Sequence, residues 1–296
     1  MNNKPQNGYY ADIEKKPLIK ILRFYFKNFG DFFPNLSVRI FTYLFSTPQK
    51  RKIRPRHTKF LNTATKKETF PAENEQIQMY IWQGGNKKIL ITHGWSGMAA
   101  DFNEMINVLH NAGFTVMAFD LPAHGFSSGK HTHMPMVMNV LKVILKRYGN
   151  FYAMIGHSLG AASTTYTLAE IPDEQKPERL VLLGVPPAPF VFFEQFRSVL
   201  AINDKLFDKC VSYIEQKVGR KIQEMAIEKS FPKIQVKNVL IIHDTNDTII
   251  PVEEVKTIAN NHENVIFFSG NHGGHFRHYK HPEVVEKVKN FVSDNI

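Results

Sequence analysis

Residues 156–160 read Gly-His-Ser-Leu-Gly and lie between a short apolar run, 151–155, and a stretch of small residues, 161–169. A serine at a sharp turn from a strand into a helix has a strained backbone, so the positions two before and two after it must be almost free of side-chain atoms. Glycine fills both positions here. Such a turn exposes the hydroxyl of Ser158 above unpaired N–H groups of the helix start, which suits a nucleophile.

Three further segments follow the order that a nucleophilic serine requires. Residues 88–92 predict a buried strand, and the glycine-bearing loop 93–97 after it can turn backbone N–H groups toward Ser158 as half of an oxyanion hole. Apolar runs at 239–242 and 265–268 predict two later strands. An aspartate-containing loop follows the first run and a histidine-containing loop follows the second. The chain therefore carries Ser, Asp and His in an order that permits a triad.

Together with Asp-Leu-Pro-Ala-His-Gly-Phe-Ser at 120–127, these motifs resemble the α/β-hydrolase family over about residues 77–295. The resemblance implies an α/β fold in which a mostly parallel central sheet is flanked by helices, with a helical cap inserted after the sixth strand. It also implies serine chemistry, since related dehalogenases and epoxide hydrolases carry aspartate at the nucleophile position. It leaves the substrate open, because this fold hosts many activities.

Two candidates exist for the base. The family pattern places the base in a Gly-His pair near the end of the chain, followed by an apolar or aromatic residue. His275, which precedes Phe276, fits that pattern better than His272. The resemblance therefore implies that His275 is the base.

Two candidates also exist for the acid. The family pattern has an aspartate at a strand end with a proline four residues later, which selects Asp247 and Pro251 over Asp244. We expect Asp244 to cap its own turn. We expect His157, inside the nucleophile turn, to have a structural role.

Four histidines, His272, His275, His278 and His281, recur every three residues, and on one helix this spacing could ligate a metal. Gly273, Gly274 and Pro282 argue against a continuous helix there. We therefore expect no metal site and no cofactor.

The predicted function is serine hydrolysis of a carboxylic ester or thioester of a small to medium, largely apolar acyl substrate. Ser158 would attack the carbonyl, His275 would transfer the proton and Asp247 would orient His275. The N–H groups of Leu159 and Trp95 would form the oxyanion hole. One alternative is a peptidase or amidase, which would need an acidic pocket for a substrate amine. The other is a non-catalytic ligand-binding or membrane-associated protein of this fold.

About fifty residues separate the predicted strand 180–185 from the strand that begins near 239, too many for an ordinary connection. Their apolar residues are spaced like those of several short amphipathic helices. The family resemblance identifies 187–233 as a helical cap. Its Phe-rich start could line an acyl pocket or attach the cap to the body, and its acidic residues form no obvious cluster: Glu194, Glu215, Glu224 and Glu228.

The predicted domains are an N-terminal basic and aromatic extension, 1–70, a hydrolase core, 71–186 and 234–296, and the cap, 187–233.

The single cysteine, Cys210, excludes an internal disulfide and fits a reducing compartment. No signal peptide and no run of 18 apolar residues is visible, so we expect a cytoplasmic location, at most peripheral to the inner face of a membrane. The oligomeric state stays open.

The net charge of +10 has a local source, since residues 50–59 hold six Lys or Arg and no acid. One interpretation is a solvated linker along the hydrolase body. The other joins this block to the aromatic segment 18–45 in a weak peripheral contact with an anionic membrane through residues 18–59. A nucleic-acid partner is not expected, because no recognised binding module accompanies the charge.

Overall fold

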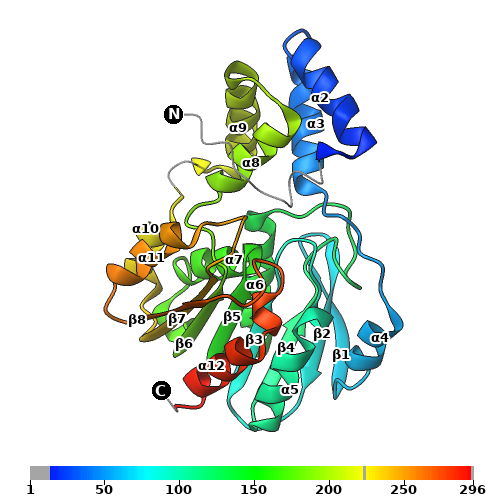
Figure 1. The fold of residues 1–296 in the computed structure, drawn as a ribbon. Helices are drawn as coiled ribbons and strands as arrows, with labels where there is room; N and C mark the ends of the chain where they lie inside the picture. The colour runs from blue at the N-terminus through cyan, green and yellow to red at the C-terminus, as the bar shows by residue number, and fades with distance from the viewer. Residues whose placement is uncertain (1–13, 223–224, 295–296) are drawn as a thin grey trace. The chain divides into compact units, whose positions relative to one another are not determined.

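The computed structural model describes residues 14–222 and 225–294, and its centre is an eight-stranded sheet (Figure 1). The strand order is β1-β2-β4-β3-β5-β6-β7-β8. The first two pairs in this order, β1–β2 and β2–β4, are antiparallel, and all other neighbours are parallel. The prediction of a mostly parallel sheet is therefore confirmed. The strand bounds are β1 Lys66–Ala72, β2 Glu75–Trp82, β3 Lys88–Thr92, β4 Thr115–Phe119, β5 Ala153–His157, β6 Arg179–Leu183, β7 Asn238–Asp244 and β8 Val265–Gly270.

The central strands are apolar at nearly every position because helices cover both faces of the sheet. Every residue of β4, β5 and β6 is buried, as expected for parallel strands between two helical layers. In one layer α5 (Asn103–Asn111) packs against α12 (Pro282–Val292). In the other, α7 (Leu159–Leu168) packs against α6 (Met134–Tyr148) and α10 (Ile227–Ile234). Further elements of the sheet unit are η1 Ala99–Phe102, η2 Asp173–Gln175, α11 Val252–Asn260 and η4 His278–Lys280.

The chain divides into two compact units. The sheet unit comprises Pro48–Pro187 and Ile227–Ile296, and the helical unit comprises Met1–Thr47 and Ala188–Ala226. The predicted extension 1–70 is thus divided at residue 47, and the predicted cap 187–233 is divided at residue 226. Of the predicted extension, residues 1–13 lie outside the described residues, as does Glu224 of the predicted cap.

The helical unit is built from α2 (Pro17–Asn28), α3 (Pro34–Ser46), α8 (Phe190–Leu200) and α9 (Asp204–Val218). Helix α2 packs against α8, and α3 packs against α9. Aromatic rings from both parts of the chain form the core: Phe45 lies 4.3 Å from Phe193 and 5.6 Å from Phe196, centroid to centroid. These rings of the Phe-rich segment therefore pack against the N-terminal helices.

The basic block 50–59 belongs to the sheet unit. The guanidinium of Arg51 lies 2.5 Å from the buried carboxylate of Asp101. Ile53 and Phe60, the latter on helix α4 (Pro55–Leu61), pack against the core of the sheet unit. No helix among the described residues is both long enough and apolar enough to cross a membrane.

Candidate active site

Ser158 occupies the junction between β5 and α7 with a strained backbone, φ 51° and ψ −115°. A Cβ at Gly156 would lie 2.6 Å from the Cα of Ala161, and a Cβ at Gly160 would lie 2.3 Å from the carbonyl oxygen of Thr92. Both distances are too short for any side chain. The two glycines therefore permit the tight approach of strand, helix and neighbouring loop that holds Ser158 in its unusual conformation.

The structure brings Ser158, His275 and Asp247 into one hydrogen-bonded chain. The Oγ of Ser158 lies 2.9 Å from Nε2 of His275, and Nδ1 of His275 lies 2.7 Å from Oδ2 of Asp247. All three residues are buried. They come from the ends of three parallel strands, β5, β7 and β8, whose carboxyl ends meet at one edge of the sheet. Residues 117 positions apart thus reach hydrogen-bonding distance.

Asp247 is held so that only one of its oxygens faces His275. Its other oxygen, Oδ1, accepts hydrogen bonds from the backbone N–H groups of Ile249 and Ile250, each at 2.8 Å. Burial alone raises the pKa of Asp247, but the hydrogen bond and charge of His275 and the backbone donors outweigh burial and hold the pKa below its usual value. Asp247 is therefore a carboxylate at neutral pH, and Nδ1 of His275 carries the proton between them.

His243, on β7, is a neighbour of Asp247 that the sequence analysis did not assign. Its Nε2 donates to the carbonyl oxygen of Ile250 at 2.8 Å and lies 3.3 Å from Oδ2 of Asp247. Burial lowers the pKa of His243, so the ring is neutral and acts as a donor. The only sequence signal for this contact was that His243 lies four residues before Asp247 at a strand end. A histidine in a solvent-facing turn could have the same spacing, so the sequence did not predict the contact.

His157 and His278 are buried histidines close to His275. The Nε2 of His157 donates to the carbonyl oxygen of His275 at 2.9 Å. The ring centroid of His278 lies 5.4 Å from that of His157. Burial lowers the pKa of His278 to about 4 and that of His157 well below its usual value, and the charge of His275 adds to both shifts. Both rings are neutral at neutral pH, so they position His275 without adding charge.

The loop after β3 lies against Ser158. A Cβ at Gly94 would lie 3.1 Å from the Cβ of Ser158. Two N–H groups of the loop are already used, because Ser96 donates to Nε2 of His124 and Gly97 donates to the carbonyl oxygen of Gly94. Within the described residues the N–H of Trp95 makes no hydrogen bond, and the N–H of Leu159, the first residue of α7, has no partner within its helix.

Asp244 and His272, the alternative candidates for the acid and the base, make contacts within and between loops. Asp244 accepts from the N–H of Asn246 at 2.7 Å and from the N–H of His272 at 2.6 Å, so it caps its own turn and also ties down the histidine loop. The side chain of His272 points to Glu283, with 3.2 Å between Nε2 and Oε2. Neither residue hydrogen-bonds Ser158 or His275 among the described contacts.

One group in the described part of the chain could hold a metal ion. The ligand atoms of His272, His281 and Glu283 lie within 4.8 Å of one another. Residues 271–281 form bends, turns and the 3-10 helix η4, so the four histidines do not share the face of one helix. The loop brings His272 near His281 instead, and His275 points to the Ser158 site.

Residues 87–225 match the model of a protein family described as having the alpha/beta hydrolase fold. A comparison with curated proteins found no match.

Solved structures resemble the chain over most of its length. An esterase from Pyrococcus furiosus superposes with a TM-score of 0.63 at 20% identity and covers 84% of this chain and 98% of its own. A thioesterase domain from the curacin biosynthetic pathway gives 0.56 at 15% identity, with 77% and 98% covered. A bacterial membrane phospholipase A gives 0.59 at 15% identity, with 94% and 97% covered. At these identities the similarity concerns the fold.

Proposed function

We propose that this chain, which has the alpha/beta hydrolase fold and matches that family's model over residues 87–225, is a serine hydrolase that cleaves a carboxylic ester or thioester through Ser158, His275 and Asp247. One observation carries the proposal: the hydrogen-bonded chain from Ser158 through His275 to Asp247, with distances of 2.9 and 2.7 Å. The strained backbone of Ser158 supports it, since strain of this kind persists where function requires it.

Acylation starts at the hydroxyl of Ser158. A serine hydroxyl is a poor nucleophile at neutral pH, so Nε2 of His275 takes its proton as Oγ attacks the substrate carbonyl carbon. Asp247, a carboxylate held by Ile249 and Ile250, stabilises the imidazolium that forms and keeps Nδ1 protonated. His275 then passes the proton to the leaving alcohol or thiol, and the acyl group remains on Ser158.

The negative charge on the carbonyl oxygen needs donors that are already in place. The N–H of Leu159 and that of Trp95 supply them in this proposal, and removal of one such donor typically costs about 10²–10³ in kcat. In the second half-reaction His275 deprotonates water, which attacks the acyl carbon; His275 then returns the proton to Oγ of Ser158 as the bond between Oγ and the acyl carbon breaks, and the carboxylic acid leaves. Each step uses only side chains and backbone groups, so the proposed reaction needs no metal or cofactor.

The substrate class is inferred from the solved structures that share this fold. The similar structures are named as an esterase, a thioesterase domain and a membrane phospholipase A, which all cleave acyl groups from oxygen or sulfur. We propose a largely apolar acyl group for this chain as well. The Phe-rich segment adds little support for an apolar acyl pocket. Its residues Phe193 and Phe196 pack against Phe45 in the core of the helical unit.

The peptidase or amidase alternative has weaker support. It would need a free acidic side chain to receive a substrate amine. Glu194 and Glu215 form ion pairs with neighbouring basic residues at 3.5 and 2.9 Å, and Glu228 accepts a hydrogen bond from the side chain of Asn261. A non-catalytic ligand-binding or membrane-associated protein would not require the hydrogen-bonded chain of Ser158, His275 and Asp247.

Labelling with a fluorescent alkyl phosphonate tests the nucleophile. The wild-type chain should label with one equivalent, and Ser158→Ala should lose both labelling and ester turnover. The matched control is Ser163→Ala, which changes a buried serine of α7 five residues after Ser158 and should label normally. Full labelling of Ser158→Ala would contradict the proposal.

A substrate panel separates the reaction classes. Nitrophenyl esters and acyl thioesters of increasing chain length should be cleaved, and matched anilides should be cleaved far more slowly. Anilide turnover equal to ester turnover would favour the amidase. A chain that labels with phosphonate but turns over none of the panel would leave the nucleophile intact and contradict the substrate class.

A further inference from the structure

Exposed apolar side chains are concentrated on one hairpin of the helical unit. Ten large hydrophobic side chains of the described residues are exposed, and eight of them belong to α2, α3 and the turn between these helices. A stable protein surface rarely gathers so many apolar side chains unless it meets a partner. We call this set the hairpin patch: Leu18, Ile21, Phe24, Phe29, Phe32, Phe33, Leu36 and Tyr43.

Helix α2 is apolar on two sides, and only one of these sides packs in the core of the helical unit. Phe26 is buried in the core of the helical unit, with Ile19 and Leu22 packed against that core. Residues 18, 21 and 24 follow helical spacing along a second stripe, and their side chains are 60%, 66% and 63% exposed. A helix that only had to pack on its unit would carry polar residues on this stripe.

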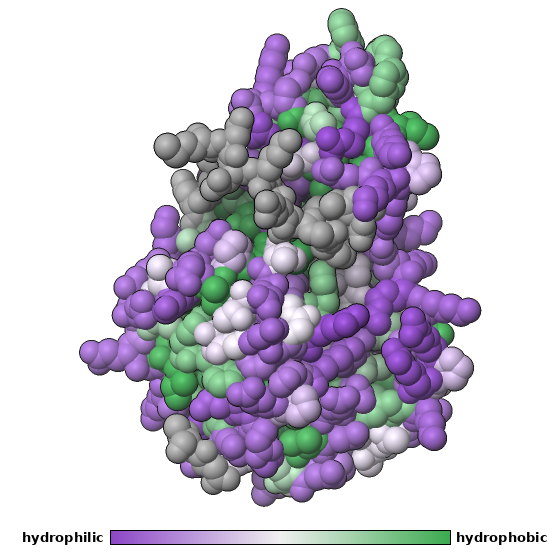
Figure 2. Space-filling view, in the orientation of Figure 1, coloured by the Kyte–Doolittle hydropathy of each residue, from purple (hydrophilic) through white to green (hydrophobic). Residues whose placement is uncertain are grey.

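The turn of the hairpin extends the stripe. Phe32 is 78% exposed, more than any other large hydrophobic side chain that the structure describes. Phe29 connects the turn to α2, with its ring centroid 6.0 Å from that of Phe24. Figure 2 shows hydrophobic surface at this end of the helical unit, over the α2–α3 hairpin. The apolar surface is therefore continuous from α2 into the turn and projects aromatic rings into solvent.

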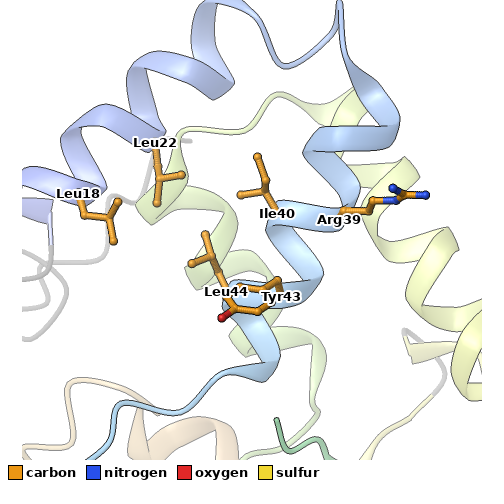
Figure 3. Close-up of a pocket in the computed structure, with 6 residues that line it drawn as sticks. All are labelled: Leu18, Leu22, Arg39, Ile40, Tyr43 and Leu44. Atoms are coloured by element: carbon orange, nitrogen blue, oxygen red, sulfur yellow. The ribbon is translucent and has the colours of Figure 1, made fainter. Parts of the chain in front are cut away.

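An apolar pocket lies between the same two helices. Four of the six residues that line it are aliphatic, and Figure 3 shows Leu22 facing Ile40 and Leu18 near Leu44, while the guanidinium of Arg39 points away. The pocket has a volume of about 390 Å³. It adds apolar surface directly beside Leu18 of the hairpin patch.

The charges around the hairpin patch are almost all positive. Lys16, Lys20, Lys27 and Arg39 are exposed, and Asp31 is the only acid from residue 15 to residue 43. The side chain of Asp31 accepts a hydrogen bond from Asn203. A partner for this surface should therefore combine an apolar interior with negative charge at its boundary.

We propose that the hairpin patch binds peripherally to an anionic lipid surface, with its aromatic and aliphatic side chains at the headgroup boundary and its lysines near the phosphates. Amphipathic helices with Phe and Leu on one side and Lys or Arg beside them bind membranes in this way. A lipid surface accepts rings that project separately from a turn, whereas a protein partner would need a cavity for each. The proposal is made for the hairpin patch and the lysines beside it; in the basic block 50–59, which belongs to the sheet unit, Arg51 pairs with Asp101.

Co-sedimentation with large unilamellar vesicles tests the proposal on the full-length chain. Vesicles of phosphatidylcholine alone should pellet little protein, and vesicles with about one third phosphatidylserine should pellet most of it at low salt. Binding should fall at 0.5 M NaCl, since salt screens exposed charges. Each basic residue near an anionic surface contributes about fivefold in partitioning, so the triple variant Lys16→Gln, Lys20→Gln, Lys27→Gln should bind about a hundredfold more weakly.

Matched variants separate the patch from total charge and hydrophobicity. Lys229→Gln, Lys237→Gln and Lys256→Gln remove the same charge from exposed positions of the sheet unit and should leave binding unchanged. Phe32→Ser with Phe33→Ser should abolish binding, while Phe126→Ser, an exposed phenylalanine outside the hairpin patch, should not. All substituted side chains are exposed, and an unchanged unfolding midpoint checks that each variant folds.

Three results would overturn the proposal. The first is no pelleting with anionic vesicles at low salt. The second is equal binding by the hairpin and control variants. The third is self-association in sedimentation velocity that Phe32→Ser with Phe33→Ser abolishes, without any vesicle binding, because the occupant would then be a second copy of the chain. None of these results depends on ester turnover, so the test is independent of the proposed function.

Discussion

The Nε2 nitrogen of His157 lies 2.9 Å from the backbone carbonyl oxygen of His275, so the residue before the proposed nucleophile holds the backbone of the proposed base. The carbonyl can only accept, and the ring is neutral because burial lowers its pKa, so the proton sits on Nε2. This contact links β5 to the loop after β8 and sets the distance across which a proton must move.

His157→Phe should therefore lower kcat by about 10–100-fold, because a small misplacement of a reacting group is costly. KM should change little. His157→Gln, which retains an N–H donor, should lose less. The measurement is steady-state ester turnover together with the rate of phosphonate labelling. Equal kcat in the wild type and both variants would show that the contact does not position His275.

The two candidate bases give a matched pair. His275→Ala should lower kcat by several orders of magnitude, as removal of a triad member does. His272→Ala should have a much smaller effect on kcat, because its ring contacts Glu283 and not Ser158. Both variants are compared in single-turnover and steady-state assays. The reverse ranking would assign the base to His272.

The two candidate acids give a second pair. Asp247→Asn should cost roughly 10⁴ in kcat, because an amide leaves the neighbouring histidine in the wrong tautomer. Asp244→Asn should reduce thermal stability more than turnover, since Asp244 accepts backbone hydrogen bonds from Asn246 and His272. Turnover and unfolding midpoints are measured on the same preparations. A nearly silent Asp247→Asn would remove Asp247 from the mechanism.

Acid should destabilise the fold partly through His278. Burial holds the pKa of His278 at about 4 in the folded state against 6.5 in the unfolded chain. Between these values only the unfolded chain is protonated, so the free energy of unfolding decreases as pH falls from 6.5 to 4, by on the order of 3 kcal/mol from this group. Asp120 acts in the opposite sense, because burial raises its pKa to about 6.

Comparison with a variant isolates the contribution of His278. His278→Gln should be less stable than the wild type at pH 7.5, and the gap should narrow toward pH 4.5 because glutamine does not titrate. Urea unfolding at a series of pH values measures both curves. Parallel curves would mean that His278 takes up its proton equally in the folded and unfolded states.

Metal removal should leave ester turnover unchanged. The proposed reaction runs through Ser158, His275 and Asp247, and the group that could bind a metal, His272 with His281 and Glu283, contains none of them. Dialysis against EDTA and 1,10-phenanthroline, followed by the ester assay, checks this. Loss of turnover that added Zn²⁺ restores would require a different mechanism.

Features that depend on neighbouring residues could be predicted from the sequence. Residues 88–92 were predicted as a strand and form β3, and the runs 239–242 and 265–268 lie within β7 and β8. The tight turn at Ser158 was also predictable, because it needs glycines two residues before and two residues after the serine, where any side chain would collide with the backbone. These signals are local: they depend on side-chain size and on continuous runs of apolar residues along a short segment.

Which distant side chains meet depends on the folded arrangement of the strands and helices. No local pattern relates His157 to the backbone of His275, or Ser158 to the ring of His275, since each contact depends on how parallel strands align at their carboxyl ends. The same holds for α2 and α3, whose inner sides pack with α8 and α9 more than 140 positions later in the chain. That these helices are rich in apolar residues follows directly from the amino-acid sequence. Which of their sides is covered depends on a partner far along the chain, and only the structure distinguishes the buried side from the exposed hairpin patch.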